Sequence, residues 1–312
     1  MSKIAVRLAV ILVCAAAGGF AAAQDRFADV KIEVTPVAGG VHMLTGAGGN
    51  MGLFVGEDGP FLVDDQYAPL SERIMAAIAT VTDEPVTFVF NTHYHGDHTG
   101  GNEAFGETGS FLVSHANVRR RLTADQFSEL LQRKNEAAAP GAWPVITFTD
   151  SLTFHWNGDE VRAFHVPHAH TDGDGVLHFP GANVVHSGDV IFFGLYPYID
   201  TSAGGSIDGM IAGVERILGL CDDETRVIPG HGPLLGKAEV AAHLAMLKKA
   251  RAQVAAAMAD GSDLAAVLAK KPCAEWDESH GQVWLTSDQF VESVYASLAA
   301  ADGGHAGHGH HH

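Results

Sequence analysis

The stretch HYHGDH, residues 93–98, is the most informative part of this chain. Four of its six side chains are imidazoles or carboxylates, which are the ligands expected for catalytic zinc. The apolar run 86–90 leads directly into it, and the β-branched and aromatic residues of that run are typical of a buried strand. Open α/β sheets place their sites in the loops that leave the carboxyl ends of strands. The sequence therefore predicts a metal site in the loop after this strand.

Three later residues carry the same kind of side chain in the same kind of position. His170, Asp189 and His231 each follow a strand-like segment and lie in a turn that contains glycine or proline. Together with HYHGDH they make seven metal-capable groups, a number that suits two ions. We expect the ions to divide these groups into two sets, His93/His95/His170 and Asp97/His98/His231, with Asp189 bridging the two or completing the second.

At these residues the chain resembles the metallo-β-lactamase superfamily of metallohydrolases. The family signature HxHxDH matches HYHGDH, and the later single ligands match in order. The resemblance covers about residues 30–235. It implies an α/β (α+β) fold, a four-layered αββα sandwich, with the metals in a cleft at one edge between the sheets. It also favours His170 over the nearby His168 as a ligand, because the residues that follow His170 match the family pattern.

The ligand set predicts a hydrolytic mechanism with two zinc ions per chain. Zinc ions ~3.5–4 Å apart can share a water and lower its pKa towards ~7, and the resulting metal-bound hydroxide would attack a carbonyl carbon. Asp97 is the expected catalytic residue, because it could orient the hydroxide and then carry its proton. Tyr196 and Tyr198 follow Asp189 and are candidate substrate-binding residues, with core packing as the alternative.

The motif does not name the substrate, which could be a β-lactam amide, a lactone, an ester or a thioester. Asp189 stands where one subclass of β-lactamases has a zinc-binding cysteine, and His98 stands where that subclass usually has an arginine. Residues 190–198 contain no lysine to hold a β-lactam carboxylate. The site is more similar to the binuclear pattern of glyoxalase II and lactonases, so β-lactam cleavage is expected to be weak or incidental.

Two other classes of function remain open at this point. A mononuclear iron persulfide dioxygenase shares the fold, although it normally uses fewer ligands than are present here. A periplasmic zinc-binding protein is suggested by the histidine-rich end of the chain, residues 301–312, which we expect to be a disordered tail.

The start of the chain is typical of a secretory signal peptide, residues 1–23. Lys3 and Arg7 precede an apolar stretch shorter than the ~20 residues of a membrane-spanning helix, and three alanines offer a cleavage site. We therefore expect a secreted, periplasmic protein without membrane insertion after cleavage. Its domain would span residues 24–300, with a helical extension from about residue 237.

The charge of the chain argues against nucleic acid as a partner. Cleavage would remove Lys3 and Arg7 but no acid, so the formal net charge would fall from −18 to −20. A small-molecule substrate is the expected partner, and the oligomeric state stays open. Cys221 and Cys273 could form a disulfide or remain buried thiols.

The polar segment 116–139 is predicted to be helical. Its three consecutive arginines, residues 119–121, could hold an anionic substrate or lie on a solvated helix face.

Overall fold

The structure is a computed structural model that describes residues 26–281 and 283–305. The predicted signal peptide lies outside the described residues. The last helix continues to His305, so residues 301–305, predicted as part of a disordered tail, belong to a helix. No helix within the described ranges is long and apolar enough to cross a membrane.

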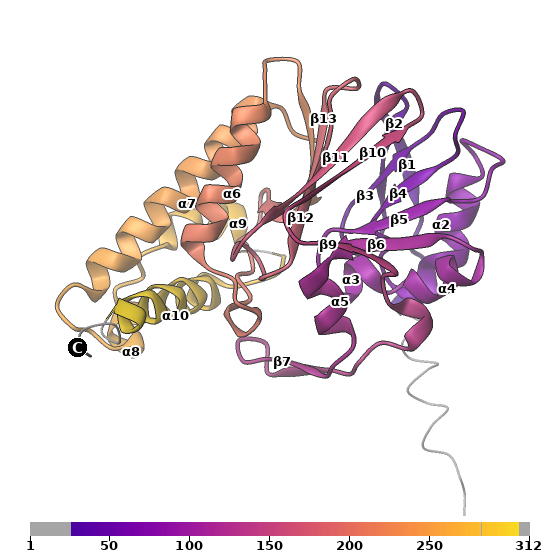
Figure 1. Ribbon diagram of the computed structural model, residues 1–312. Coiled ribbons are helices and arrows are strands. Elements are labelled where there is room, and N and C mark those ends of the chain that lie inside the picture. Colours follow the sequence, from indigo (N-terminus) through magenta and orange to yellow (C-terminus); the bar gives the residue numbers. More distant parts are fainter. Residues whose placement is uncertain (1–25, 282, 306–312) are drawn as a thin grey trace, which may run out of the picture.

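Two mixed β-sheets pack face to face at the centre of the molecule (Figure 1). The first runs in the order β1-β2-β3-β4-β5-β6-β9, and the second in the order β10-β11-β12-β13-β14. The first sheet consists of β1 (Glu33–Ala38), β2 (Val41–Thr45), β3 (Met51–Phe54), β4 (Phe61–Val63), β5 (Phe88–Asn91), β6 (Phe111–His115) and β9 (Ile146–Phe148). The second consists of β10 (Ser151–Trp156), β11 (Asp159–Val166), β12 (Asp174–Phe179), β13 (Val184–Phe192) and β14 (Arg226–His231).

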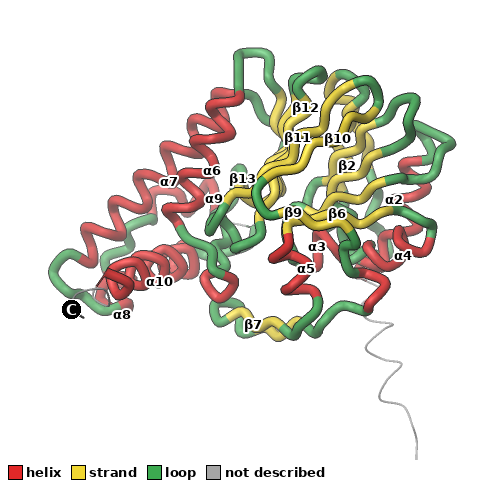
Figure 2. Tube along the Cα trace, viewed as in Figure 1, coloured by secondary structure: helices red, strands yellow, loops and turns green. Residues whose placement is uncertain are grey.

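Helices cover the outer face of each sheet, which gives the predicted four-layered arrangement (Figures 1 and 2). The first sheet carries α2 (Ser71–Ile78), α3 (Gly96–Thr99), α4 (Asn102–Glu107) and α5 (Ala116–Leu122). On the side of the second sheet lie α6 (Ile207–Leu220), α7 (Lys237–Met258), α8 (Leu264–Ala269), α9 (Asp277–His280) and α10 (Ser287–His305). Short 3₁₀ turns η1 (Ala68–Leu70), η2 (Pro140–Ala142), η3 (Thr201–Ala203) and η4 (Ala274–Trp276) link these elements.

Each interface between layers has its own apolar core. Phe61, Phe90 and Leu177 belong to the cluster between the two sheets. Ile74 of α2 packs in a second cluster beneath the first sheet, and Val214 of α6 packs in a third behind the second sheet. Strands such as β4 and β13 are buried along their whole length, because both faces of the sheet are covered.

The helix predicted for residues 116–139 is wrong beyond Leu122. After α5 the chain forms the antiparallel hairpin β7 (Gln126–Ser128) and β8 (Arg133–Asn135). The hairpin is held by residues distant in sequence, since Ser128 Oγ lies 2.7 Å from Tyr198 Oη and the Glu129 backbone N–H donates to Ser202 Oγ. Tertiary contacts therefore override the helical propensity of this segment.

Both cysteines among the described residues are free. Cys221 and Cys273 are buried in the apolar cluster behind the second sheet. Of the two alternatives, a disulfide or buried thiols, the structure shows buried thiols.

Candidate metal centre

Strand β5 positions the first ligands. It ends at Asn91, and the loop that follows carries His93 and His95 before α3 begins at Gly96. Asp97 and His98 lie in the first turn of α3, so the HYHGDH stretch turns sharply at the carboxyl end of a central strand. This is the location predicted for the metal site.

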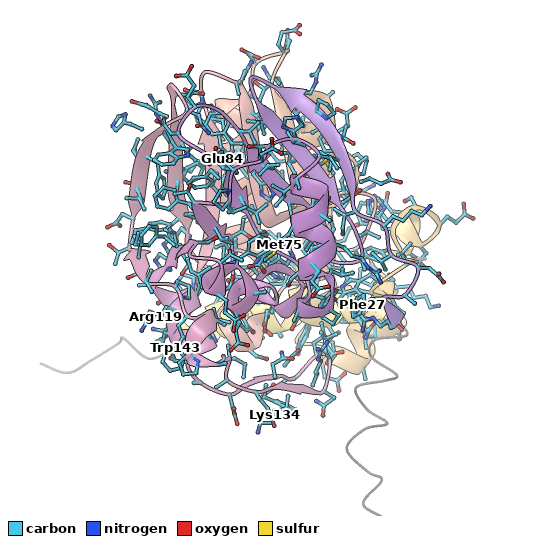
Figure 3. The ribbon with its side chains drawn as sticks, turned by 90° about the vertical axis from the view of Figure 1, so that its right-hand side faces the viewer. Phe27, Met75, Glu84, Arg119, Lys134 and Trp143 are labelled. Atoms are coloured by element: carbon cyan, nitrogen blue, oxygen red, sulfur yellow. The ribbon has the colours of Figure 1, made fainter. Side chains whose placement is uncertain are left out.

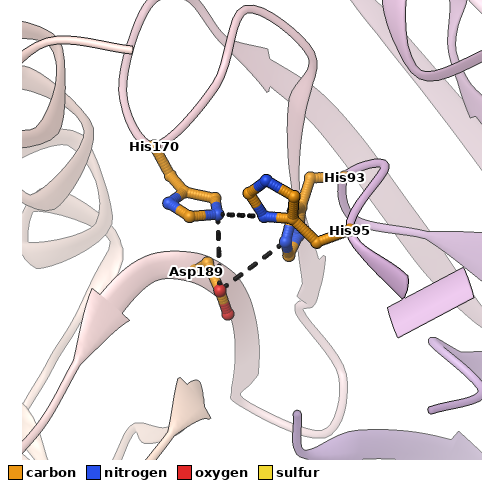
Figure 4. Close-up of side chains that lie close together, drawn as sticks. All are labelled: His93, His95, His170 and Asp189. Atoms are coloured by element: carbon orange, nitrogen blue, oxygen red, sulfur yellow. Dashed lines mark hydrogen bonds and ion pairs between the residues drawn. The ribbon is translucent and has the colours of Figure 1, made fainter. Parts of the chain in front are cut away.

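The second sheet supplies the remaining ligands. His170 lies in the loop between β11 and β12, Asp189 lies within β13, and His231 ends β14. Together the two sheets assemble two groups of donors, and within each group all donor atoms lie within 4.8 Å of one another. The groups are His93/His95/His170/Asp189 (Figure 4) and Asp97/His98/His231.

In the first group the hydrogen bonds of the far ring nitrogens determine where the lone pairs point. His95 Nε2 lies 3.0 Å from the Asp200 carboxylate, and His170 Nδ1 lies 2.7 Å from the Tyr198 carbonyl oxygen. These oxygens only accept, so both nitrogens carry the proton in a neutral ring. His95 Nδ1 and His170 Nε2 then face each other with lone pairs at 2.8 Å (Figure 4). Such an arrangement needs a cation between or beside them.

The same reasoning applies to His98 and His93. His98 Nδ1 donates to Asp64 Oδ2 at 2.8 Å, so its Nε2 carries the lone pair. Thr92 Oγ1 donates to the same Asp64 oxygen and therefore accepts from His93 Nδ1 at 3.1 Å. Asp64 is fully buried and thus orients both imidazoles, one directly and one through Thr92.

Buried atoms without partners point to the same conclusion. Among the described residues, His93 Nε2 and Asp189 Oδ1 have no hydrogen-bond partner although both are buried. Burial lowers the pKa of His93 well below its ordinary value and lowers that of His170 to about 4, so both rings stay neutral, as metal ligands must be. The donor set therefore fits two divalent cations.

Asp189 occupies the centre between the two groups. Its Oδ2 lies 3.6 Å from His93 Nε2 and 3.5 Å from both His170 Nε2 and His231 Nε2. Its Oδ1 lies 3.2 Å from His98 Nε2. A single carboxylate thus reaches imidazoles of both groups. Its donor atoms group with His93, His95 and His170, so Asp189 does not complete the second set, which was one of the two alternatives drawn from the sequence.

In the second group the carboxylates attract positive charge. Burial alone would disfavour a charged His98, but Asp189, Asp97 and Asp64 raise its pKa well above the ordinary value. A metal cation would take the place of that proton.

The backbone packs tightly against the same ring. Glycine is required beside it, since a Cβ on Gly49 would overlap the His98 imidazole.

Asp200 contacts a donor imidazole, and the sequence reasoning missed it. Its Oδ2 accepts from Tyr94 Oη at 2.7 Å and from His95 Nε2 at 3.0 Å, and its Oδ1 accepts from the Ala203 backbone N–H. Burial raises its pKa, but the bonds from His95 and Tyr94 outweigh burial and hold the pKa at about 2. No motif marks this residue, because its partner His95 is 105 positions away.

The other candidates are distributed as follows. Tyr198 lines the cleft above the ligands, whereas Tyr196 is fully buried and donates from Oη to the Cys273 carbonyl oxygen. Tyr196 therefore packs in the core, which was the alternative to substrate binding. His168 is exposed, with its ring near the Gly204 carbonyl, and takes no part in either donor group. Of the arginines at 119–121, two pair with Asp172.

A cleft of about 240 Å³ opens above the two groups. Asp97, Asp189 and His231 form part of its floor. Its walls include aromatic and aliphatic side chains, Tyr67, Tyr94, Leu131, Phe192, Leu195, Tyr198 and Trp284. The donors therefore face a space that can receive a small organic molecule with an apolar part.

Comparison with known proteins agrees with this geometry. The chain is 26% identical over 226 residues to a hydroxyacylglutathione hydrolase of Gloeobacter violaceus, covering 68% of this chain and 79% of that protein. It is 25% identical over 267 residues to the 2,4-dinitroanisole O-demethylase subunit alpha of a Nocardioides species, covering 84% and 76%.

Solved structures share the fold. A metallo-β-lactamase from Pontibacter korlensis superposes with a TM-score of 0.57 at 19% identity, over 70% of this chain and 99% of that one. The sec-alkylsulfatase Pisa1 from a Pseudomonas species superposes with a TM-score of 0.63 at 16% identity, over 90% and 52%. The family model of the metallo-β-lactamase superfamily matches residues 44–236, more than half of the chain. By ligand pattern, fold and family match, the chain belongs to the metallo-β-lactamase superfamily.

Proposed function

We propose that this protein is a binuclear zinc hydrolase that cleaves a carbonyl substrate, an ester, lactone, thioester or amide. One observation carries the proposal: two groups of imidazole and carboxylate donors meet at Asp189 on the floor of a single cleft. Two zinc ions held there would supply Lewis-acid polarisation of a carbonyl and a water of lowered pKa.

Proton transfer to and from the reacting groups would fall to Asp97. Asp97 lines the cleft, and its Oδ2 lies 3.4 Å from His231 Nε2 and 3.7 Å from His98 Nε2. Burial opposes ionisation of Asp97, but His98 and His231 keep its pKa below the ordinary value, so it is ionised at neutral pH. An ionised carboxylate facing the cleft can orient the attacking water, accept its proton and return that proton to the leaving group.

A complete second donor group favours this reaction over the iron alternative. Asp97, His98 and His231 converge within 4.8 Å in addition to the first group, so the chain offers ligands for two ions rather than one. The ordered cleft above them also supports an enzyme over a protein that only stores zinc, because storage needs no space for a substrate.

We propose a class of substrate, a carbonyl compound, and not a single molecule. The hydroxyacylglutathione hydrolase relative favours thioesters, and the β-lactamase structures favour β-lactams, but both are distant. Among the described lining residues there is no lysine, the residue expected to hold a β-lactam carboxylate. We propose a periplasmic location on the basis of the signal-like residues 1–23. Cell fractionation followed by mass spectrometry would test this, since the protein should be found in the periplasmic fraction without the mass of residues 1–23.

The decisive experiment combines metal analysis with a substrate panel. The chain would be purified beside a variant whose histidines at 308 and 310–312 are serine, so that metal held by the tail can be subtracted. Both are expected to retain about two zinc ions at the centre. Assays with phenyl acetate, a lactone, a thioester, nitrocefin and an aryl methyl ether then identify the reaction. Turnover of the ester, lactone, thioester or β-lactam that is lost in Asp97→Ala supports the proposal. Turnover of the aryl methyl ether alone, or one bound iron without hydrolysis, refutes it.

A further inference from the structure

The outer wall of the cleft is built by two segments that belong to neither large sheet. The β7–β8 hairpin contributes Leu131 and Arg133, and the residues just before α10 contribute Val283 and Trp284. These four residues line the cleft but belong to neither donor group, so they would contact a part of the substrate other than the reacting carbonyl. Their side chains therefore bear on substrate selection.

Trp284 provides an apolar surface that is open to solvent. Its side chain is 53% exposed although it lines the cleft, and the adjacent Val283 is 80% exposed. Leu131 and Leu195 line the same space. An exposed indole at the mouth of a cleft gains free energy when an apolar group covers it, so this wall favours a substrate with an apolar body.

Arg133 provides the positive charge. It is the one lysine or arginine among the described residues that line this cleft, and no carboxylate of the described chain lies within ion-pair distance of its guanidinium. Nearby cations are already paired: Lys134 lies 2.7 Å from Asp125, and Arg120 and Arg121 each lie 2.7 Å from Asp172. Arg133 is thus left to pair with a ligand.

We propose that Arg133 and Trp284 form a recognition subsite for a carboxylate-bearing substrate with an apolar body. The carboxylate pairs with the guanidinium, the apolar body lies against the indole, and the scissile carbonyl reaches Asp97 and Asp189. The inference rests on the proposed hydrolysis and narrows its substrate class. It assigns selection to the hairpin, since residues 190–198 carry no lysine.

The test uses two esters that differ by one carboxylate, phenyl acetate and 4-acetoxybenzoate, with the full metal-loaded chain. Arg133 is exposed, so Arg133→Gln should lower the ratio of kcat/KM for the anionic over the neutral ester about fivefold, the effect of losing one ion pair that stays open to solvent. Lys134→Gln makes the same change of charge on the same hairpin, at a side chain that points away from the molecule (Figure 3). It should leave the ratio within twofold. Equal ratios in the two variants would overturn the role of Arg133.

A second pair of variants tests the apolar wall. Trp284→Ala should raise KM for both esters at least threefold. Phe127→Ala is the matched control, because Phe127 is 52% exposed on the hairpin but does not line the cleft. Equal KM values in these two variants would overturn the role of Trp284.

Direct binding keeps this inference separate from the proposed function. Calorimetry would compare benzoate with benzyl alcohol in the chain, in Arg133→Gln and in Lys134→Gln. Direct contact of benzoate with metal is common to all three proteins and cancels in the comparison. If no carbonyl compound is hydrolysed, the proposed function fails, but benzoate binding weakened only by Arg133→Gln still supports the subsite. Equal benzoate affinity in the two variants refutes it.

Discussion

Replacing Asp200 with asparagine should weaken metal binding although Asp200 is not itself a ligand. Its carboxylate accepts three hydrogen bonds, two at Oδ2 from Tyr94 and His95 and one at Oδ1 from the Ala203 backbone. An asparagine has one acceptor oxygen, and its NH₂ group would face a donor in either orientation. At least one buried donor therefore loses its acceptor, at a cost of roughly 1–3 kcal/mol.

The substitution weakens the bond from His95 in either orientation. With the NH₂ group at the Oδ2 position the His95 N–H loses its acceptor, and with the amide oxygen there a neutral acceptor replaces a charged one, so the tautomer of this ring is held less firmly. Partners that orient a metal-binding histidine typically contribute 10–100-fold to metal affinity, which is roughly 1.4–2.7 kcal/mol. Competition with a chromophoric chelator would measure the affinity of each ion in the chain and in Asp200→Asn. We expect one of the two binding steps to weaken by that factor, since His95 belongs to one donor group.

A graded variant shows whether the reasoning is right. Tyr94→Phe removes the 2.7 Å bond to Asp200 but leaves the bond from His95, so its effect on metal affinity should stay below tenfold. Cobalt substitution adds a spectroscopic readout, because a change in ligand orientation alters the visible bands of the ion. Unchanged affinity and an unchanged cobalt spectrum in Asp200→Asn would refute the positioning role.

Three further outcomes follow from the same geometry. Asp64→Ala leaves the Nδ1–H of His98 without its acceptor, so metal content measured by mass spectrometry should fall from about two ions towards one, and retention of both would contradict the role of Asp64. Gly49→Ala places a methyl group on the His98 ring and should also cost the second ion, whereas Gly109→Ala, which has open space around it but a φ of +97°, should affect stability alone. His243 of α7 has a pKa lowered to about 3 by burial and by His280, so the unfolded chain takes up a proton that the folded chain does not as the pH falls below about 6.5. Its neutral ring therefore costs about 2 kcal/mol of stability between pH 7 and pH 5, and urea unfolding of His243→Leu should lack that part of the pH dependence.

Local patterns were enough to predict much of the fold. The apolar run 86–90 before HYHGDH overlaps β5, and the helix predicted to begin at residue 116 does begin there, as α5. These predictions succeed because strand and helix periods are properties of neighbouring residues. The prediction failed between residues 123 and 139, where Ser128 and Glu129 bind a distant loop and the chain forms a hairpin instead of a helix.

The sequence by itself determined the chemistry of this protein, namely seven imidazole and carboxylate donors, each close to a strand-like segment. The tertiary structure decided how those donors work. It put Asp189 between the two groups, set the tautomers of His95 and His98 through Asp200 and Asp64, and brought Arg133 and Trp284 to the same cleft. Motif spacing is a short-range property, whereas these pairs are separated by tens to more than a hundred residues and meet only when the two sheets pack together.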